Sequence, residues 1–171
     1  LHYFQRSFVF PLLMKGKSQM PIAIMLMGIT FNVINGLLIG TSLFTLPPSA
    51  FNEGSVYLTH PTSIAGIAIF FIGMGINIHS DPVIRHLRQP GDTRHYLPSK
   101  GMYRYVTSAN YFGELVEWTG FALFCSTPAA WLFVIWTAAN LVPRAAAIHK
   151  RYRKEFGDAV GHRKRVIPFV Y

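Results

Sequence analysis

Long apolar stretches separated by short polar and basic segments dominate the chain. Residues 20–46 contain no charged side chain, and this stretch exceeds the roughly 20 residues that a helix needs to cross the hydrocarbon core. A second apolar stretch covers residues 61–79. It is rich in small residues that let neighbouring helices approach closely, namely Ala65, Gly66, Gly73 and Gly75. Both stretches predict membrane-spanning helices.

A third apolar stretch, residues 118–143, is interrupted by Ser-Thr-Pro at 126–128. Pro128 disfavours helical conformation at Thr127 and suits the first turn of a new helix. We therefore expect two antiparallel helices joined by a very tight turn, one starting near Tyr103 and one running from Pro128 to about His149. The predicted fold class is an all-α, multi-span transmembrane bundle with about four complete spans and the end of an earlier helix.

Basic residues agree with this topology. They follow or precede the predicted spans on one side only, while the loop at 47–60 has Glu53 and no Lys or Arg, so the positive-inside bias puts the basic ends in the cytosol. The 16 Lys and Arg against 7 Asp and Glu give a net charge of +9. Because these charges cap membrane helices, no nucleic-acid partner is expected. The single Cys125 excludes an intramolecular disulfide and a cysteine-based metal cluster, and no metal site is predicted.

Ionisable side chains within a span are costly and therefore mark candidate functional sites. Glu114 and Glu117 lie in the third predicted span. Asn110, Glu114 and Trp118 follow at a spacing of four residues, which places them on one helix face that must point inward. An interhelical hydrogen bond without a ligand is the structural alternative for Asn110 and Glu114.

Asn77, His79 and Asp81 close the second span. Asp81 before Pro82 is typical of an N-cap followed by proline at the first helical position, which predicts a short basic helix containing Arg85 and Arg88. A phosphate-bearing ligand would fit at the start of such a helix. Gly73-Met-Gly75 lies inside a span and is no Rossmann motif, so any nucleotide must be held by the helical bundle.

The sequence resembles the steroid 5α-reductase (3-oxo-5α-steroid 4-dehydrogenase) family over nearly its whole length. The resemblance rests on the runs HYFQRSFVFPLL, GMGINIHSDPVIRHLRQPGD, GMYRYVTSANYFGELVEWTGFAL and PRAAAIHKRYRKEFGD, and on RKRVIPF near the end. It implies a seven-helix membrane enzyme that binds NADPH among its carboxy-terminal helices. Residues 1–171 would be one membrane domain holding about five of those helices, with the amino-terminal helices absent from this chain.

By this resemblance, the cofactor-binding residues are Asn77, Asp81, Arg88, Asn110, Glu114, Tyr152 and Arg163. Secondary candidates are His149, Arg85 and Arg144. His149 is secondary because a His-His pair of the family reads Ile148-His149 here. For Arg144, and for the basic residues after it, anchoring at the membrane surface is the alternative interpretation.

The resemblance implies hydride transfer to the β-carbon of an α,β-unsaturated ketone and proton addition at the adjacent carbon. Tyr3 matches the family's catalytic tyrosine, whose hydroxyl would donate a hydrogen bond to the ketone oxygen as negative charge develops there. The family's partner glutamate, in its second helix, has no counterpart here, so the chain alone is expected to bind cofactor without turning over substrate.

The expected partners are a steroid or related lipid enone, membrane lipids and the missing amino-terminal helices. The expected location is the endoplasmic reticulum membrane in a eukaryote or the inner membrane in a bacterium. Three other functions remain open: a membrane enoyl-thioester reductase, an isoprenylcysteine-type methyltransferase that binds S-adenosylmethionine, and a scaffold whose buried Asn and Glu only join helices.

Overall fold

The computed structural model of the protein describes residues 2–4, 8–13, 21–87 and 94–171. Regular structure in these residues is helical, apart from one isolated bridge between Val106 and Lys164. The elements in chain order are α1 (His2–Phe4), α2 (Phe10–Leu13), α3 (Ile22–Phe44), η2 (Ser49–Thr59), α4 (Pro61–Arg85), η3 (Gly101–Arg104), α5 (Ala109–Cys125), α6 (Pro128–Phe156) and η4 (Gly157–Val160). The predicted all-α class is therefore confirmed.

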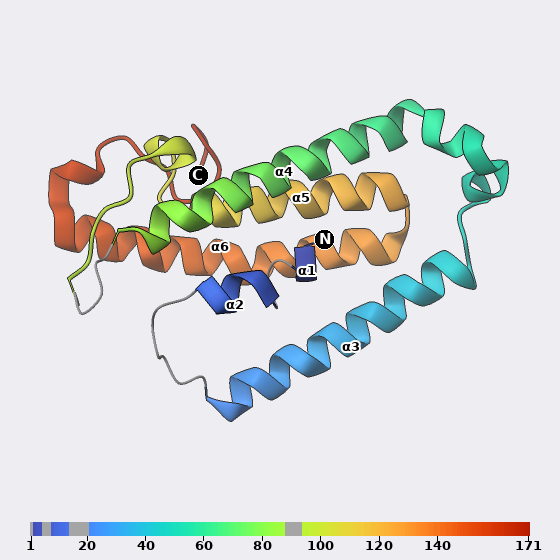
Figure 1. The fold of residues 1–171 in the computed structure, drawn as a ribbon, viewed down its shortest axis with the longest axis horizontal. Coiled ribbons are helices and arrows are strands. Elements are labelled where there is room, and N and C mark those ends of the chain that lie inside the picture. Colours follow the sequence, from blue (N-terminus) through green and yellow to red (C-terminus); the bar gives the residue numbers. More distant parts are fainter. Residues whose placement is uncertain (1, 5–7, 14–20, 88–93) are drawn as a thin grey trace.

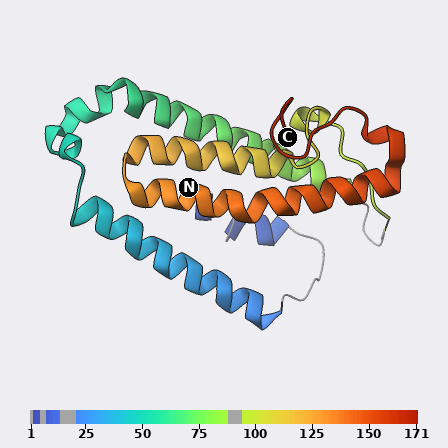
Figure 2. The same cartoon turned by 180° about the vertical axis from the view of Figure 1, so that it is seen from behind.

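The bundle consists of α4, α5 and α6, with α5 in the middle (Figures 1 and 2). The α3 helix lies at an angle to them and approaches α6 through Phe31, whose ring centroid is 6.0 Å from that of Phe133 and 5.4 Å from that of Trp136. None of its residues is buried in the described part of the chain. A helix that keeps an apolar surface on all sides requires an apolar surrounding such as lipid.

Three described helices, α3, α4 and α6, are long and apolar enough to cross a membrane. The remaining helix of the bundle, α5, has 17 residues and is about 25 Å long at 1.5 Å per residue, slightly less than the roughly 30 Å hydrocarbon core. Of the four predicted spans, three thus reach full length, and α5 packs between two of them.

Glycines bring α4 and α5 into backbone contact. A Cβ atom built on Gly73 would lie 2.2 Å from the backbone nitrogen of Glu117, and one built on Gly120 would lie 2.3 Å from that of Phe70. Gly66 and Gly113 are similarly closed off by the facing helix. Gly75, by contrast, has nothing within 4 Å. Gly66 and Gly73 therefore fulfil the predicted close approach, and Gly75 does not take part in it.

The expected start of the third helix near Tyr103 is wrong. Tyr103 belongs to η3, and α5 begins only at Ala109. The intervening backbone pairs with the carboxy-terminal tail, because the Thr107 amide donates to the Lys164 carbonyl at 2.9 Å and the Ser108 amide to the Arg165 carbonyl at 3.1 Å. The β-branched Val106 and Thr107 favour this extended conformation over a helix.

The expected N-cap at Asp81 is also wrong. Asp81 and Pro82 lie inside α4, which continues to Arg85 without a break, so no separate basic helix begins there. The helix tolerates Pro82 because it loses only one backbone hydrogen bond, and the His86 amide still donates to the Pro82 carbonyl at 3.0 Å. Arg85 consequently lies in a last helical turn, at the negative end of the helix dipole.

The expected turn between α5 and α6 is confirmed. Ser126 adopts a left-handed conformation with φ 51°, and the side chain of Thr127 accepts a hydrogen bond from the Ala130 amide at 3.3 Å. Pro128 occupies the first turn of α6. This helix runs past His149 to Phe156, because no helix breaker occurs after Pro143 until Gly157, which has a positive φ of 52°.

Candidate functional site

A cavity of about 360 Å³ lies among α1, α3, α5 and α6. Tyr3 and Glu114, both predicted site residues, line it together with the secondary candidate Arg144. Its other polar lining residues are His2, Asn32, Thr137 and Asn140, and its apolar walls include Phe31, Trp118, Phe133 and Trp136. This composition of an apolar cavity with a few polar groups is typical of a small-molecule site.

Tyr3 is held among aromatic rings at this cavity. Its ring centroid is 5.4 Å from that of His2 and 6.0 Å from that of Trp118. It nevertheless keeps 48% of its surface exposed, so a ligand can reach it. Glu114 and Trp118, one turn apart on α5, line the same cavity, which confirms the inward-pointing face predicted for them.

Several predicted cofactor residues surround Tyr103, which lies outside the spans. The Tyr103 hydroxyl donates to Oδ1 of Asn110 at 3.3 Å. Burial raises the pKa of the Tyr103 phenol well above its ordinary value, and the nearby Tyr152 and Asp81 act in the same direction. Tyr103 is 1% exposed and therefore stays a neutral donor. Asn77, one turn before Asp81 on α4, is buried against α5.

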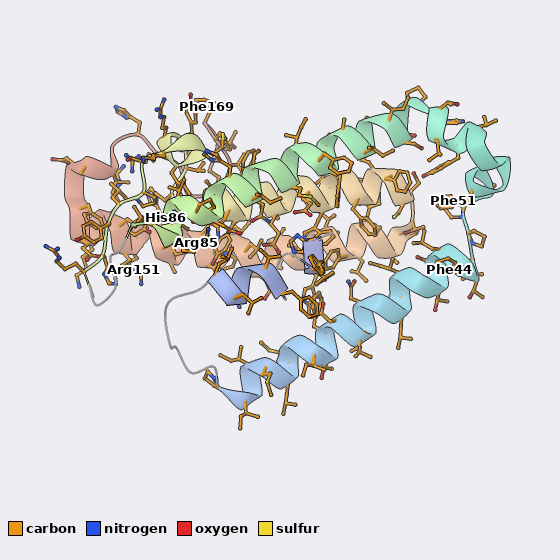
Figure 3. The ribbon with its side chains drawn as sticks, viewed as in Figure 1. Phe44, Phe51, Arg85, His86, Arg151 and Phe169 are labelled. Carbon is orange, nitrogen blue, oxygen red and sulfur yellow. The ribbon has the colours of Figure 1, made fainter. Side chains whose placement is uncertain are left out.

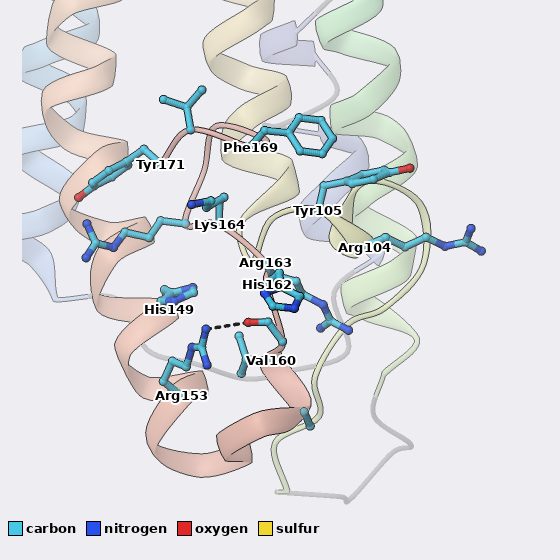
Figure 4. A pocket seen from close by; sticks show the side chains of 14 residues that line it. Arg104, Tyr105, His149, Arg153, Val160, His162, Arg163, Lys164, Phe169 and Tyr171 are labelled. Carbon is cyan, nitrogen blue, oxygen red and sulfur yellow. Dashed lines mark hydrogen bonds between the residues drawn. The ribbon is translucent and has the colours of Figure 1, made fainter.

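A second, larger cavity of about 880 Å³ lies at the carboxy-terminal end of the bundle (Figure 4). Two further candidates, His149 and Arg163, line it. Its lining also contains Arg104, Arg153, His162, Lys164 and Arg165, with no acidic residue among the described ones. Arg153 donates to the Gly161 carbonyl at 2.7 Å and Arg163 to the Pro98 carbonyl at 3.0 Å. Such a concentration of cations suits a phosphate-bearing ligand.

The tail that forms one wall of this basic cavity is fixed to the segment just before α5. The Lys164 amide donates to the Tyr105 carbonyl at 2.9 Å, and the Thr107 amide donates back to Lys164. His149 contributes from α6, with Nδ1 3.3 Å from the Thr107 hydroxyl. Figure 4 shows the side chains of His149, Arg153 and Lys164 around the same space.

Most of the predicted residues thus fall into three groups. Tyr3, Glu114 and Arg144 share the first cavity, Asp81, Asn110 and Tyr152 gather near Tyr103, and His149 and Arg163 share the basic cavity. Arg85 lines neither cavity and is half-buried at the end of α4 (Figure 3). Arg88 lies outside the described residues.

Sequence reasoning missed His2 and Tyr103, and it singled out Glu117 without giving it a role. His2 and Glu117 form a buried contact beside Tyr3, with His2 Nδ1 3.0 Å from each carboxylate oxygen, and Tyr103 lies at the centre of the second group. Glu117 carried a usable signal, since a carboxylate inside a span is costly. His2 and Tyr103 carried none, because their partners are distant in the sequence or on another element.

The fold defines a helical membrane protein, with a cavity of apolar walls and a few polar side chains among its helices. Comparison with known proteins gives the family. Residues 18–171 match the family model described as 3-oxo-5-alpha-steroid 4-dehydrogenase. The chain therefore belongs to the 3-oxo-5-alpha-steroid 4-dehydrogenase family.

Individual relatives match almost the whole chain. It is 41% identical to bovine (Bos taurus) 3-oxo-5-alpha-steroid 4-dehydrogenase 1 over 99% of its length, which covers 65% of that protein. Identity is 37% to the human (Homo sapiens) type 1 protein, with 100% of this chain and 64% of the relative covered. Identity to the human type 2 protein is 38%, with 100% of this chain and 65% of the relative covered. The chain thus spans about two thirds of the length of these relatives.

Proposed function

We propose that the chain is the carboxy-terminal, NADPH-binding part of a membrane enzyme that reduces the Δ4 double bond of a 3-oxo-steroid. Hydride would go to C5 and a proton to C4, giving a 5α-steroid. The observation that carries this proposal is the cavity shared by Tyr3 and Glu114, in a chain of this family whose relatives are named as 3-oxo-5-alpha-steroid 4-dehydrogenases.

The residues present fit NADPH in two respects. The basic cavity offers Arg163 and neighbouring cations without an opposing described carboxylate, which suits the phosphates of a dinucleotide. Glu114, in the smaller cavity, offers carboxylate oxygens, which can accept from an amide such as that of nicotinamide. The group near Tyr103 would contact the part of NADPH that lies between the nicotinamide and those phosphates. This group consists of Asp81, Asn110 and Tyr152. Asn77 and Arg88 would make further contacts. NADPH supplies the hydride when bound.

Tyr3 would act on the substrate carbonyl. As the β-carbon is reduced, negative charge develops on the ketone oxygen, and a hydroxyl held at that oxygen donates a hydrogen bond that strengthens towards the transition state. The surrounding apolar walls, including Trp118 and Phe133, exclude water and strengthen this interaction. The family's partner glutamate would come from the amino-terminal helices.

An apolar cavity supports a steroid or related lipid enone as substrate. It has a volume of about 360 Å³, lies between α3 and α6, and is lined almost wholly by apolar side chains such as Ile34, Leu38 and Leu132. Phe31, Phe133, Met27 and Trp136 line both this cavity and the one that contains Tyr3. A flat apolar ligand could therefore extend from one into the other.

The proposed location is the endoplasmic reticulum membrane in a eukaryote or the inner membrane in a bacterium, with the basic ends in the cytosol. Arg85 and Arg151 lie at one end of the bundle, and Phe44 and Phe51 at the other (Figure 3). This asymmetry supports one orientation of the helices across the membrane.

A thermal-shift titration of the complete, detergent-solubilised protein tests the cofactor. NADPH is expected to raise the melting temperature in a concentration-dependent way, because a ligand that binds only the folded state stabilises it. S-adenosylmethionine is expected to have no effect. Stabilisation by S-adenosylmethionine alone would replace the reductase proposal with a methyltransferase.

A further inference from the structure

His2 and Glu117 form a buried contact that the proposed function has not used. Glu117 lies on α5 and has no exposed surface, and His2 is 8% exposed. Nδ1 of His2 lies 3.0 Å from both Oε1 and Oε2 of Glu117. Because a carboxylate only accepts, Nδ1 must carry the proton and donate it. Glu117 therefore keeps a proton on Nδ1 of His2. The other ring nitrogen, Nε2, makes no contact with Glu117.

Packing fixes the part of α5 that carries this carboxylate. The backbone of Glu117 is pressed against α4 at Gly73, where an added Cβ would come within 2.6 Å of the Glu117 Cα. A buried contact between a histidine and a glutamate seldom stabilises a fold more than well-packed apolar residues would, because both partners lose their hydration. The pair consequently needs a role other than stability.

The position of His2 suggests that role. His2 directly precedes Tyr3 on α1, a helix of only three residues that cannot hold its own conformation through internal hydrogen bonds. The His2 ring meets the Tyr3 ring edge-on, at 5.4 Å and 82°, and lies 4.6 Å from the Trp118 ring. Trp118 is the residue after Glu117 and itself lies 6.0 Å from Tyr3.

We propose that His2 and Glu117 are positioning residues that hold the hydroxyl of Tyr3 at the cavity. Glu117 fixes His2 from α5, and His2 together with Trp118 fixes the Tyr3 ring. This inference rests on the proposed function, in which Tyr3 donates to the ketone oxygen. The inference adds that α5 orients the Tyr3 hydroxyl. This orientation depends on the hydrogen bond between His2 and Glu117, which are 115 positions apart in the sequence.

The test uses the complete protein in lipid nanodiscs, with NADPH and a Δ4-3-ketosteroid. His2→Phe keeps a ring and removes the donor, and Glu117→Leu removes the acceptor. Each is expected to lower kcat about 10- to 100-fold, the effect of misplacing a reacting group by about 1 Å, with KM for NADPH within about 2-fold of wild type. The double variant should lose no more than either single variant, because both remove the same contact.

A conservative variant and a matched pair serve as controls. Glu117→Gln keeps an acceptor for Nδ1, so it should recover most of kcat even if Glu117→Leu fails to fold. His95 and Glu155 form a similar contact, Nδ1 to Oε1 at 2.9 Å, on the exposed surface. His95→Phe and Glu155→Leu should leave kcat unchanged.

The outcomes separate this inference from the proposed function. An active wild type with His2→Phe within 2-fold of its kcat would overturn the positioning role and leave the reductase intact. Equal losses of thermal stability, NADPH binding and kcat in every variant of the pair would show a purely structural contact. A wild type that reduces no enone would overturn both.

Discussion

Glu114 and Glu117 lie less than one turn apart on α5 yet have different surroundings. Glu114 is half-buried and lines the cavity with Tyr3, whereas Glu117 has no exposed surface and contacts His2. A carboxylate facing a cavity can accept a hydrogen bond from a ligand, whereas Glu117 does not line this cavity and contacts His2 instead. This difference in surroundings supports the two proposed roles, ligand binding for Glu114 and positioning for Glu117.

Glu114 gives the first prediction. Glu114→Gln should weaken NADPH binding about 10-fold, because a hydrogen bond to a charged acceptor contributes roughly 1.5–3 kcal/mol. Glu155→Gln, which removes an equally charged but exposed side chain at the far end of α6, is the control and should leave the affinity unchanged. Tryptophan fluorescence titration in detergent measures both. Unchanged affinity in Glu114→Gln would remove this residue from the cofactor site.

At the scale of elements, the contact between α4 and α5 positions the site. It brings Asn77 and Asp81 of one helix next to the helix that carries Asn110 and Glu114, with glycines at the points of closest approach. In lipid, such close packing supplies much of the association between helices because the hydrophobic effect is absent there. A change in this contact should therefore affect stability and cofactor binding together.

Replacing a contact glycine tests this interface. Gly73→Ala should destabilise the protein by about 1–3 kcal/mol, since the added methyl group meets backbone atoms that cannot move independently. Gly75→Ala, two residues away with open space around it, is the matched control and should be neutral or slightly stabilising. Thermal unfolding in detergent measures both. Equal melting temperatures for the two variants would contradict the observed packing.

The carboxy-terminal tail gives a third prediction. Arg163→Gln should lower the affinity for NADPH about 10-fold or more, because the basic cavity loses a charged donor to phosphate. Lys154→Gln removes an exposed charge that does not line this cavity and should have no such effect. Isothermal titration of both variants decides whether the basic cavity holds the cofactor's phosphates or serves only as a membrane-facing surface.

Some elements could be predicted from the sequence and others could not. Hydropathy located α3, and Pro128 located the α5–α6 turn, because both depend on local chain properties. The break expected at Asp81–Pro82 was wrong because tertiary packing of α4 against α5 overrides one missing hydrogen bond. The start of α5 was wrong because Thr107 and Ser108 pair with residues more than 50 positions later, which no local pattern encodes. Likewise, Glu114 could be singled out because an ionisable side chain within a span is costly. His2 could not, because its partner Glu117 is 115 positions away.

For the whole molecule, the alternation of basic and neutral ends predicts how the helices cross the membrane. In a background with the buried Cys125 replaced by Ser, Lys150→Cys should react with a membrane-impermeant maleimide from the cytosolic side. Thr59→Cys, in η2 just before the start of α4, should react only after the membrane is made permeable. Labelling of both cysteines from the same side would contradict the topology.

The most direct test of the proposed function follows the hydride itself. The complete protein is incubated with NADPH deuterated at the transferable C4 position and a Δ4-3-ketosteroid, and the product is analysed by mass spectrometry. We expect a 5α-steroid with one deuterium at C5, and loss of this product in Tyr3→Phe while NADPH binding persists. A wild-type protein that binds NADPH but forms no deuterated steroid would contradict the assignment of this chain to a steroid 5α-reductase.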